Sequence, residues 1–125
     1  MNLVAAEVYF HPNDDIHCAT VGFRAADHSY FLLSRALAPT QQDRRLGHDA
    51  VYIELSDQGL GCYDGVSAVS VFPALVRFDL NERGKRATHQ SIVEIRHSLA
   101  LEQSLQLRQV LALVFDGFPR YADCG

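Results

Sequence analysis

Apolar and polar residues alternate in short runs through most of the chain, and turn-forming residues separate these runs. Alternation of this kind puts the apolar side chains on one face of an extended strand. Short polar joints favour antiparallel pairing, because parallel strands need long crossover connections. The pattern therefore predicts a mainly antiparallel β-sheet, with strands in segments 2–11, 17–25, 30–37, 50–56, 66–72, 74–80 and 91–99.

The alternation also predicts which side chains face the core. In segments 2–11, 17–25 and 50–56, every second residue is apolar and should face the core, and in segment 50–56 this leaves Tyr52 and Glu54 on the opposite face. The core-facing residues are Val4, Ala6, Val8 and Phe10; Ala19, Val21 and Phe23; and Val51, Ile53 and Leu55.

Turns are expected where Pro, Asn, Asp and Gly gather between the strands. Segment 11–15 and the pairs Asp64-Gly65 and Pro73-Ala74 have this composition. Asp64-Gly65 signals a tight turn, because Gly can take a positive φ and Asp tolerates it. Segment 38–49 is polar and predicts a surface loop, and segment 81–90 predicts a loop or one short helix.

The period changes to that of a helix near the end of the chain. Leu107, Leu111 and Val114 fall at i, i+4 and i+7, and Leu101, Leu105, Val110 and Phe115 widen the stripe. Ser98 is the expected N-cap, and Gly117 and Pro119 should end the helix. Such a stripe must be covered, so the helix should pack on the sheet. The expected fold is α+β: a single domain over residues 1–125, mainly an antiparallel β-sheet with a C-terminal α-helix packed on it.

The amino-acid composition excludes several classes of protein for this chain. The 125 residues are 48% hydrophobic with a formal net charge of −4, which is ordinary for one globular domain. The charge argues against nucleic-acid binding, because phosphate contacts require clustered Lys and Arg. Three cysteines without CxxC spacing favour a reducing compartment, hence the cytoplasm. We expect neither a signal peptide nor a membrane span.

Candidate catalytic and metal-binding groups lack the spacing that their chemistry requires. Gly59-Leu60-Gly61 is not followed by the helix that a phosphate loop needs. None of the six histidines forms an HExxH motif, and His17 and Cys18 should point to opposite faces of a strand. Cys62 has no evident basic neighbour to lower its pKa. We therefore expect no catalytic residue, metal or cofactor.

Polar and aromatic side chains gather around one predicted hairpin. They are Tyr52, Glu54, Asp57, Gln58 and Tyr63, followed by Asp64. Aromatic residues cover area at low entropic cost, and acids add directional charge. This mixture favours recognition of another protein, although Tyr and Glu are also ordinary residues of exposed strands.

The same stretch, "DAVYIELSDQGLGCYDGVSAVSV", resembles immunity protein family ten of bacterial polymorphic toxin systems. The matching residues are Tyr52, Glu54, Asp57, Gln58, Tyr63 and Gly65. Leu33 and Arg35 are similar to the family's Leu-x-Arg strand, and the strand, strand, helix ending also matches. The resemblance covers residues 29–117. Cys62 departs from it, since a small polar residue is expected there.

The resemblance implies a cytoplasmic protein that binds a cognate toxin and blocks it sterically, without catalysis. The expected toxin-binding residues are Tyr52, Glu54, Asp57, Gln58, Tyr63 and Asp64. Two alternatives from other classes stay open: a small hydrolase that uses Cys62 or the nearby acids, and a small-ligand or oligomeric module. A homodimer formed through an exposed strand edge is a further alternative.

Overall fold

A computed structural model describes residues 1–12 and 17–125, with Gln58 described by its backbone alone. The helices are α1 (Gln41–Arg45), α2 (Glu82–Thr88) and α3 (Leu101–Val114), with a 3-10 turn, η1 (Gln58–Leu60). The strands are β1 (Asn2–His11), β2 (Cys18–Ala25), β3 (Tyr30–Ala36), β4 (Tyr52–Leu55), β5 (Gly61–Tyr63), β6 (Val66–Phe72), β7 (Leu75–Leu80), β8 (Ile92–Arg96) and β9 (Tyr121–Asp123).

The strands of the described residues form one mixed sheet in the order β5-β4-β3-β2-β1-β8-β7-β6-β9. Strands β1 to β5 form one antiparallel meander, and β6 to β8 form another. Two pairings are parallel: β1 with β8, and β6 with β9. The α+β class is confirmed, but the sheet is not purely antiparallel. Strand β9, which has three residues and no apolar alternation, was also not predicted.

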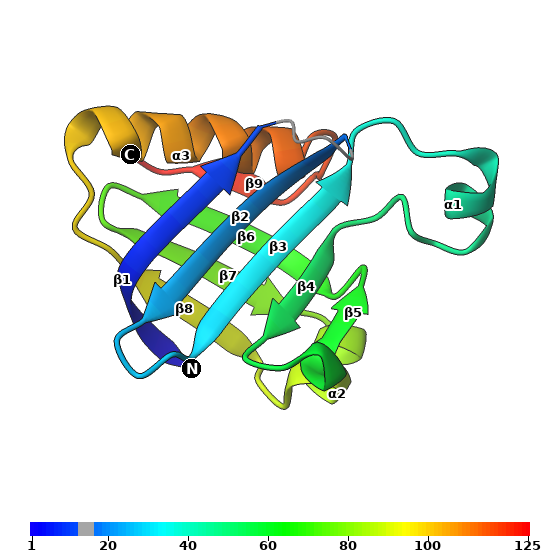
Figure 1. Ribbon diagram of the computed structural model, residues 1–125, viewed down its shortest axis with the longest axis horizontal. Helices are drawn as coiled ribbons and strands as arrows, with labels where there is room; N and C mark the ends of the chain where they lie inside the picture. The colour runs from blue at the N-terminus through cyan, green and yellow to red at the C-terminus, as the bar shows by residue number, and fades with distance from the viewer. Residues whose placement is uncertain (13–16) are drawn as a thin grey trace.

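The two meanders face each other, so the sheet encloses the core between its own halves. In Figure 1 the strands β1 to β4 lie in front of β6 to β8. Phe31 of β3 packs on Phe78 of β7 with ring centroids 5.1 Å apart, and Phe23 of β2 lies 6.4 Å from Phe78. All three rings are fully buried. This aromatic contact joins the halves across the core.

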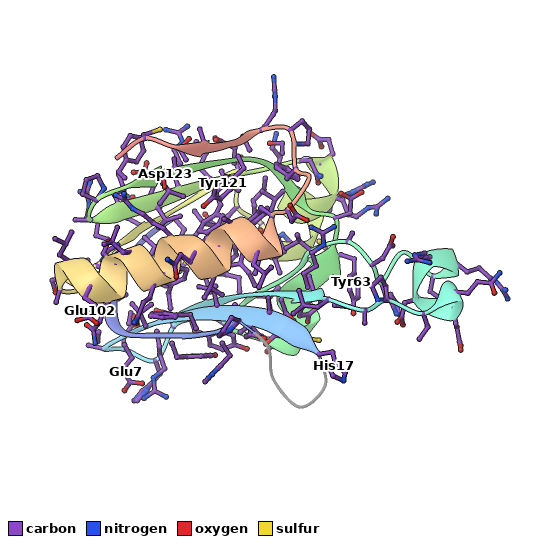
Figure 2. All side chains as sticks on the ribbon, turned by 90° about the horizontal axis from the view of Figure 1, so that it is seen from above. Glu7, His17, Tyr63, Glu102, Tyr121 and Asp123 are labelled. Atoms are coloured by element: carbon purple, nitrogen blue, oxygen red, sulfur yellow. The ribbon has the colours of Figure 1, made fainter. Side chains whose placement is uncertain are left out.

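Helix α3 lies along the open side between the two halves of the sheet (Figure 2). The predicted stripe is largely confirmed, because Leu107, Val110, Leu111, Val114 and Phe115 are buried.

Three expectations for this helix were wrong. Leu101 and Leu105 are 77% and 48% exposed, because the buried face of the helix runs through Ser104, Leu107 and Leu111 and leaves these two leucines outside it. Ser98 is not the N-cap: Ala100 is, without a side-chain cap. The backbone turns before the helix, where the Leu99 N–H donates to Nδ1 of the buried His97 at 3.4 Å.

Strand β1 differs from its predicted pattern because it contains a bulge. Its register with β2 shifts between Ala5 and Glu7, which adds one residue and reverses the inward face. Val8 and Phe10 are partly buried against the core, as expected. Val4 is 68% exposed and Ala6 is exposed, whereas Leu3 takes the buried position. The inward groups of segments 17–25 and 50–56 are confirmed, since every member is buried.

The chain bends at Asp64-Gly65, as the tight-turn signal predicts, but the flanking strands β5 and β6 do not pair with each other. Asp64 takes the positive φ, 56°, and Gly65 does not. Gly65 is closely packed, because a Cβ there would lie 2.7 Å from Cys62 Sγ and 3.1 Å from the Cα of Gly84. A Cβ on Gly84 of α2 would lie 2.2 Å from the Gly65 carbonyl oxygen, so the helix packs directly on this segment. The turn at Pro73-Ala74 joins β6 to β7 as expected.

The loops contain more structure than the sequence indicates. The segment expected to be a surface loop contains α1, none of whose residues is buried. Segment 81–90 contains one short helix, α2, which was one of the two predicted outcomes. Most of the turn predicted over 11–15 lies outside the described residues.

Arg35 of β3 binds the end of α3. Its Nη1 donates to the carbonyl oxygens of Val114 at 3.2 Å and Asp116 at 2.6 Å. Carbonyls at a helix C-terminus lack partners within the helix and carry partial negative charge. Arg35, which is part of the Leu-x-Arg resemblance, therefore makes a structural contact that fixes the helix against the sheet.

Replacing Gly84 by alanine should destabilise the protein. Helix propensity alone would favour alanine by about 1 kcal/mol. The added Cβ would overlap rigid backbone at Gly65, and overpacking of this kind costs about 1–3 kcal/mol. We expect a net loss in the free energy of unfolding, measured by urea denaturation. Gly59→Ala is the control, because its Cβ would meet only Asp57 at an ordinary 3.4 Å. Equal stability of both variants would contradict the contact.

Candidate functional site

Four of the chain's five tyrosines belong to the outer face of strands β1 to β5 or to its edges. The pairing register brings them together. Tyr52 of β4 lies opposite Tyr63 of β5. Glu54 of β4 lies opposite Leu32 of β3, and Tyr30, two residues before Leu32, is on the same face of β3. Tyr9 of β1 lies opposite Gly22 of β2. We call this surface the tyrosine face; it consists of Tyr9, Tyr30, Tyr52, Glu54 and Tyr63.

Glu54 holds two of these tyrosines. The Tyr52 hydroxyl donates to Oε1 of Glu54 at 2.6 Å, and the Tyr30 hydroxyl donates to Oε2. Glu54 is only 7% exposed although it points away from the core, because the neighbouring rings cover it. A covered carboxylate is costly unless its oxygens are hydrogen-bonded. The two hydroxyls satisfy that requirement, and in return the carboxylate fixes both rings.

The same contacts change the acidity of the tyrosines. The hydrogen bond to Glu54, with a smaller contribution from burial, raises the pKa of Tyr30 to about 12. Burial, followed by the hydrogen bond to Glu54, raises the pKa of Tyr52 well above its usual range. Both phenols are therefore neutral hydrogen-bond donors at physiological pH.

Ring contacts continue the tyrosine face toward the edge of the sheet. The rings of Tyr52 and Tyr63 are tilted, with centroids 5.1 Å apart. His48, from the segment before β4, stacks on Tyr63 with a centroid separation of 4.4 Å and an interplanar angle of 18°. Aromatic pairs at these separations stabilise each other beyond the area they bury. The edge rings are thus fixed in orientation.

Two glycines make room for the rings. A Cβ on Gly22 would lie 2.1 Å from the Tyr9 ring, and a Cβ on Gly61 would lie 2.5 Å from the Tyr52 hydroxyl. Both strands therefore lack a side chain where a tyrosine lies over them. Tyr9 remains 45% exposed in this position.

Two exposed acids flank strand β5. Asp57 precedes it and caps η1 by accepting the Gly59 N–H at 2.8 Å. Asp64 follows it and lies 3.9 Å from Arg83, with both side chains largely exposed. Of the predicted residues, the structure thus brings Tyr52, Glu54 and Tyr63 together and places Asp57 and Asp64 at the ends of β5. Gln58 begins η1, and its side chain is outside the described atoms.

Cys62 lies on the opposite side of the sheet from the tyrosine face. It pairs with the buried Ile53 and packs against the core. Burial raises the pKa of its thiol, which keeps it protonated and a poor nucleophile. Cys62 and Glu54 therefore point to different faces and do not form one reactive site.

The hollow that contains Asp64 is small. Its volume is about 190 Å³, and Arg35, Asp116 and Phe118 also line it. Small-molecule sites are commonly several hundred Å³. Within residues 1–12 and 17–125, no three His, Cys, Asp or Glu side chains come together as metal ligands. The described helices include none long and apolar enough to cross a membrane.

Sequence reasoning missed two members of the tyrosine face, and the histidine that stacks on it. Tyr30 could have been found, since it alternates with the buried Phe31 and Leu33 on a strand predicted next to the Glu54 strand. Alternation with Val8 and Phe10 points Tyr9 outward, but its position over Gly22 depends on the register between β1 and β2, which alternation does not reveal. No sequence signal places His48 on Tyr63, because that contact depends on the path of a long connection.

The fold and this surface define a small α+β protein with a polar, aromatic outer face. The model of the family described as Immunity protein 10 matches residues 4–106, which is most of the chain. The chain belongs to this family, as the resemblance in the sequence implied. The match begins earlier than the resemblance over 29–117 and ends within α3. None of the curated proteins compared with the chain matches it.

Removing the carboxylate charge of Glu54 should change the alkaline behaviour of the protein. The pKa of Tyr30 is above its unfolded value of about 10. Its contribution to stability is therefore complete below pH 10 and is lost as the pH rises through about 12. In Glu54→Gln we expect the Tyr30 pKa to move back toward 10, so that the protein is less stable at neutral pH and its loss of stability between pH 10 and 12 becomes smaller.

The measurement is an NMR titration of the tyrosine ring carbons together with urea denaturation between neutral and alkaline pH. Tyr121 is an internal control, because burial raises its pKa to about 12 without any contact to Glu54. An unchanged Tyr30 titration in Glu54→Gln would show that the carboxylate does not hold the phenol.

Proposed function

We propose that this protein is an immunity protein that binds a cognate toxin domain and neutralises it by steric occlusion, without catalysis. It would act in the cytoplasm as one domain over residues 1–125. Membership of the Immunity protein 10 family supports the class of function. The observation that carries the proposal for the binding site is the tyrosine face, whose rings are ordered before any partner arrives.

Order in the free protein favours tight binding. Immobilising a flexible side chain at an interface costs about 0.5–1.5 kcal/mol. Tyr30 and Tyr52 are already held by Glu54, and Tyr63 contacts the tilted Tyr52 ring and stacks on His48. Tyrosine is also among the residues that contribute most to binding at protein interfaces. The proposed contact residues are Tyr52, Glu54, Asp57, Gln58, Tyr63 and Asp64.

These residues have different roles in the proposal. Tyr52 and Tyr63 supply contact area, and Glu54 acts indirectly because it is covered by the rings that it positions. Asp57 and Asp64 are exposed and supply negative charge at the margin. Charges at the margin mainly accelerate association and fix orientation. The toxin surface opposite them would be basic.

The positions of Cys62 and Glu54 do not support the alternative function of a hydrolase. The Cys62 thiol is half-buried and faces the core side, and the Glu54 carboxylate is occupied by two hydroxyls. Steric blocking requires only an ordered surface, and the tyrosine face provides one. We therefore favour inhibition by binding over inhibition by a reaction.

Binding should depend on the tyrosine face. The assay is calorimetry with the toxin domain encoded beside this protein. Tyr63→Ala should weaken affinity by about thirtyfold, the effect of losing about 2 kcal/mol from an aromatic contact. Asp57→Asn with Asp64→Asn should slow association at low salt, because Asn preserves the cap and the positive φ while removing both charges.

The matched control is Glu94→Gln with Glu102→Gln. It also removes two negative charges, but from β8 and from the far end of α3; Figure 2 shows Glu102 and Tyr63 at opposite ends of the molecule. The control should bind like the wild type. Equal affinities for wild type, Tyr63→Ala and the double Asn variant would place the interface elsewhere.

A further inference from the structure

The connection between β3 and β4 stands away from the rest of the protein. We call residues 38–49 the arm; it carries α1 at its tip. Both views show α1 projecting beyond the sheet (Figures 1 and 2). None of the residues of α1 is buried. The arm therefore contributes little to the core, and its shape requires another explanation.

Local hydrogen bonds nevertheless give the arm a defined conformation. Thr40 and Asp43 form a capping box: the Asp43 N–H donates to Thr40 Oγ1 at 3.1 Å, and the Thr40 N–H donates to Asp43 Oδ2 at 2.8 Å. After the helix, Gly47 takes a φ of 76° and the His48 N–H donates to the Asp43 carbonyl at 2.8 Å.

This order is notable because a five-residue helix is too short to be stable alone. Fixing each backbone residue costs about 1–2 kcal/mol. The capping box and the turn at Gly47 offset part of that cost without any burial in the core. A preformed projection with no packing role is the form expected of a contact element.

The exposed side chains at the tip include basic and apolar ones beside the polar Gln41 and Gln42. Arg44 and Arg45 are exposed and form no ion pair with the residues that the structure describes. Leu46 beside them is 58% exposed. Arginine binds carboxylates in a fixed two-point geometry, and an exposed leucine beside it adds apolar contact area.

The base of the arm is fastened to the tyrosine face. His48, at the end of the arm, stacks on Tyr63 at 4.4 Å. The arm and the tyrosine face are therefore one continuous surface with opposite charges at its two ends. Asp57 and Asp64 lie at the face, and Arg44 and Arg45 lie at the tip.

We infer that the arm is a second binding element for the same partner, with its tip seated on an acidic, partly apolar depression of the toxin. The inference rests on the proposed function. The partner surface would carry the reverse pattern, basic opposite the tyrosine face and acidic opposite the tip. Two charge pairs of opposite sign fix the orientation of a complex, because the reversed orientation would oppose like charges.

A nucleic acid is the other class of ligand that arginines could attract. Two arginines on a chain of net charge −4 provide few phosphate contacts, and the acids at the tyrosine face would repel a long polyanion. The arm is therefore assigned to a protein partner, and nucleic-acid binding becomes an outcome of the test.

The test compares full-length variants against the toxin domain encoded beside this protein. Arg44→Glu with Arg45→Glu should weaken affinity by about a hundredfold, and Leu46→Ser by about tenfold. Neither change should alter the unfolding midpoint, because no side chain of α1 is buried. The control, Arg96→Glu with Arg120→Glu, makes the same change in net charge at two exposed positions outside the arm and should bind like the wild type.

The outcomes separate the two claims. If the arm variants bind like the wild type while Tyr63→Ala binds weakly, the arm inference is wrong and the proposed function stands. If the wild type does not bind the toxin domain, both are wrong. If the protein binds a DNA duplex or single-stranded RNA through Arg44 and Arg45 at physiological salt, the assignment to a protein partner is wrong.

Discussion

The packing of Phe31 against Phe78 determines which way the neighbouring strands face. It anchors β3 to the opposite half of the sheet, and the register of β3 with β4 then points Ile53 and Leu55 inward. Side chains alternate along a strand, so Tyr52 and Glu54 must point outward. A slip of one residue would bury the tyrosine and expose the isoleucine. The outer surface is thus a consequence of the core.

Glu54 converts this outward orientation into a fixed surface. Most outward acids on a sheet are solvated, but this one is covered and accepts hydrogen bonds from two strands. Fixing side chains in the free protein reduces the entropy lost on binding. The stacking of His48 extends the same order to the arm. A surface and a projection that are already ordered suit a protein whose function is to block another one.

The sequence predicted the parts that depend on local periodicity. The inward faces of β2 and β4 and most of the α3 stripe follow from spacing alone. The predictions from local periodicity failed where contacts between residues distant in the sequence decide the structure. The β1 bulge moved Val4 outward, β5 and β6 pair with other strands and not with each other, and the parallel pairings join segments distant in the chain.

The candidate site shows the same division. The polar, aromatic character of the hairpin was visible in the sequence, and alternation placed Tyr52 and Glu54 together. The burial of Glu54 was not visible, because it requires Tyr30 from another strand. The arm appeared only as a polar loop, since a capping box within a helix of five residues gives too short a periodic signal.

The most direct test is hydrogen–deuterium exchange of the protein alone and in complex with the toxin domain encoded beside it. The account predicts that added protection against exchange is concentrated in β4, β5 and the arm, while the backbone amides of α3 and of β6 to β8 exchange as in the free protein. Protection confined to α3 or to β9, with β4, β5 and the arm exchanging as in the free protein, would contradict it.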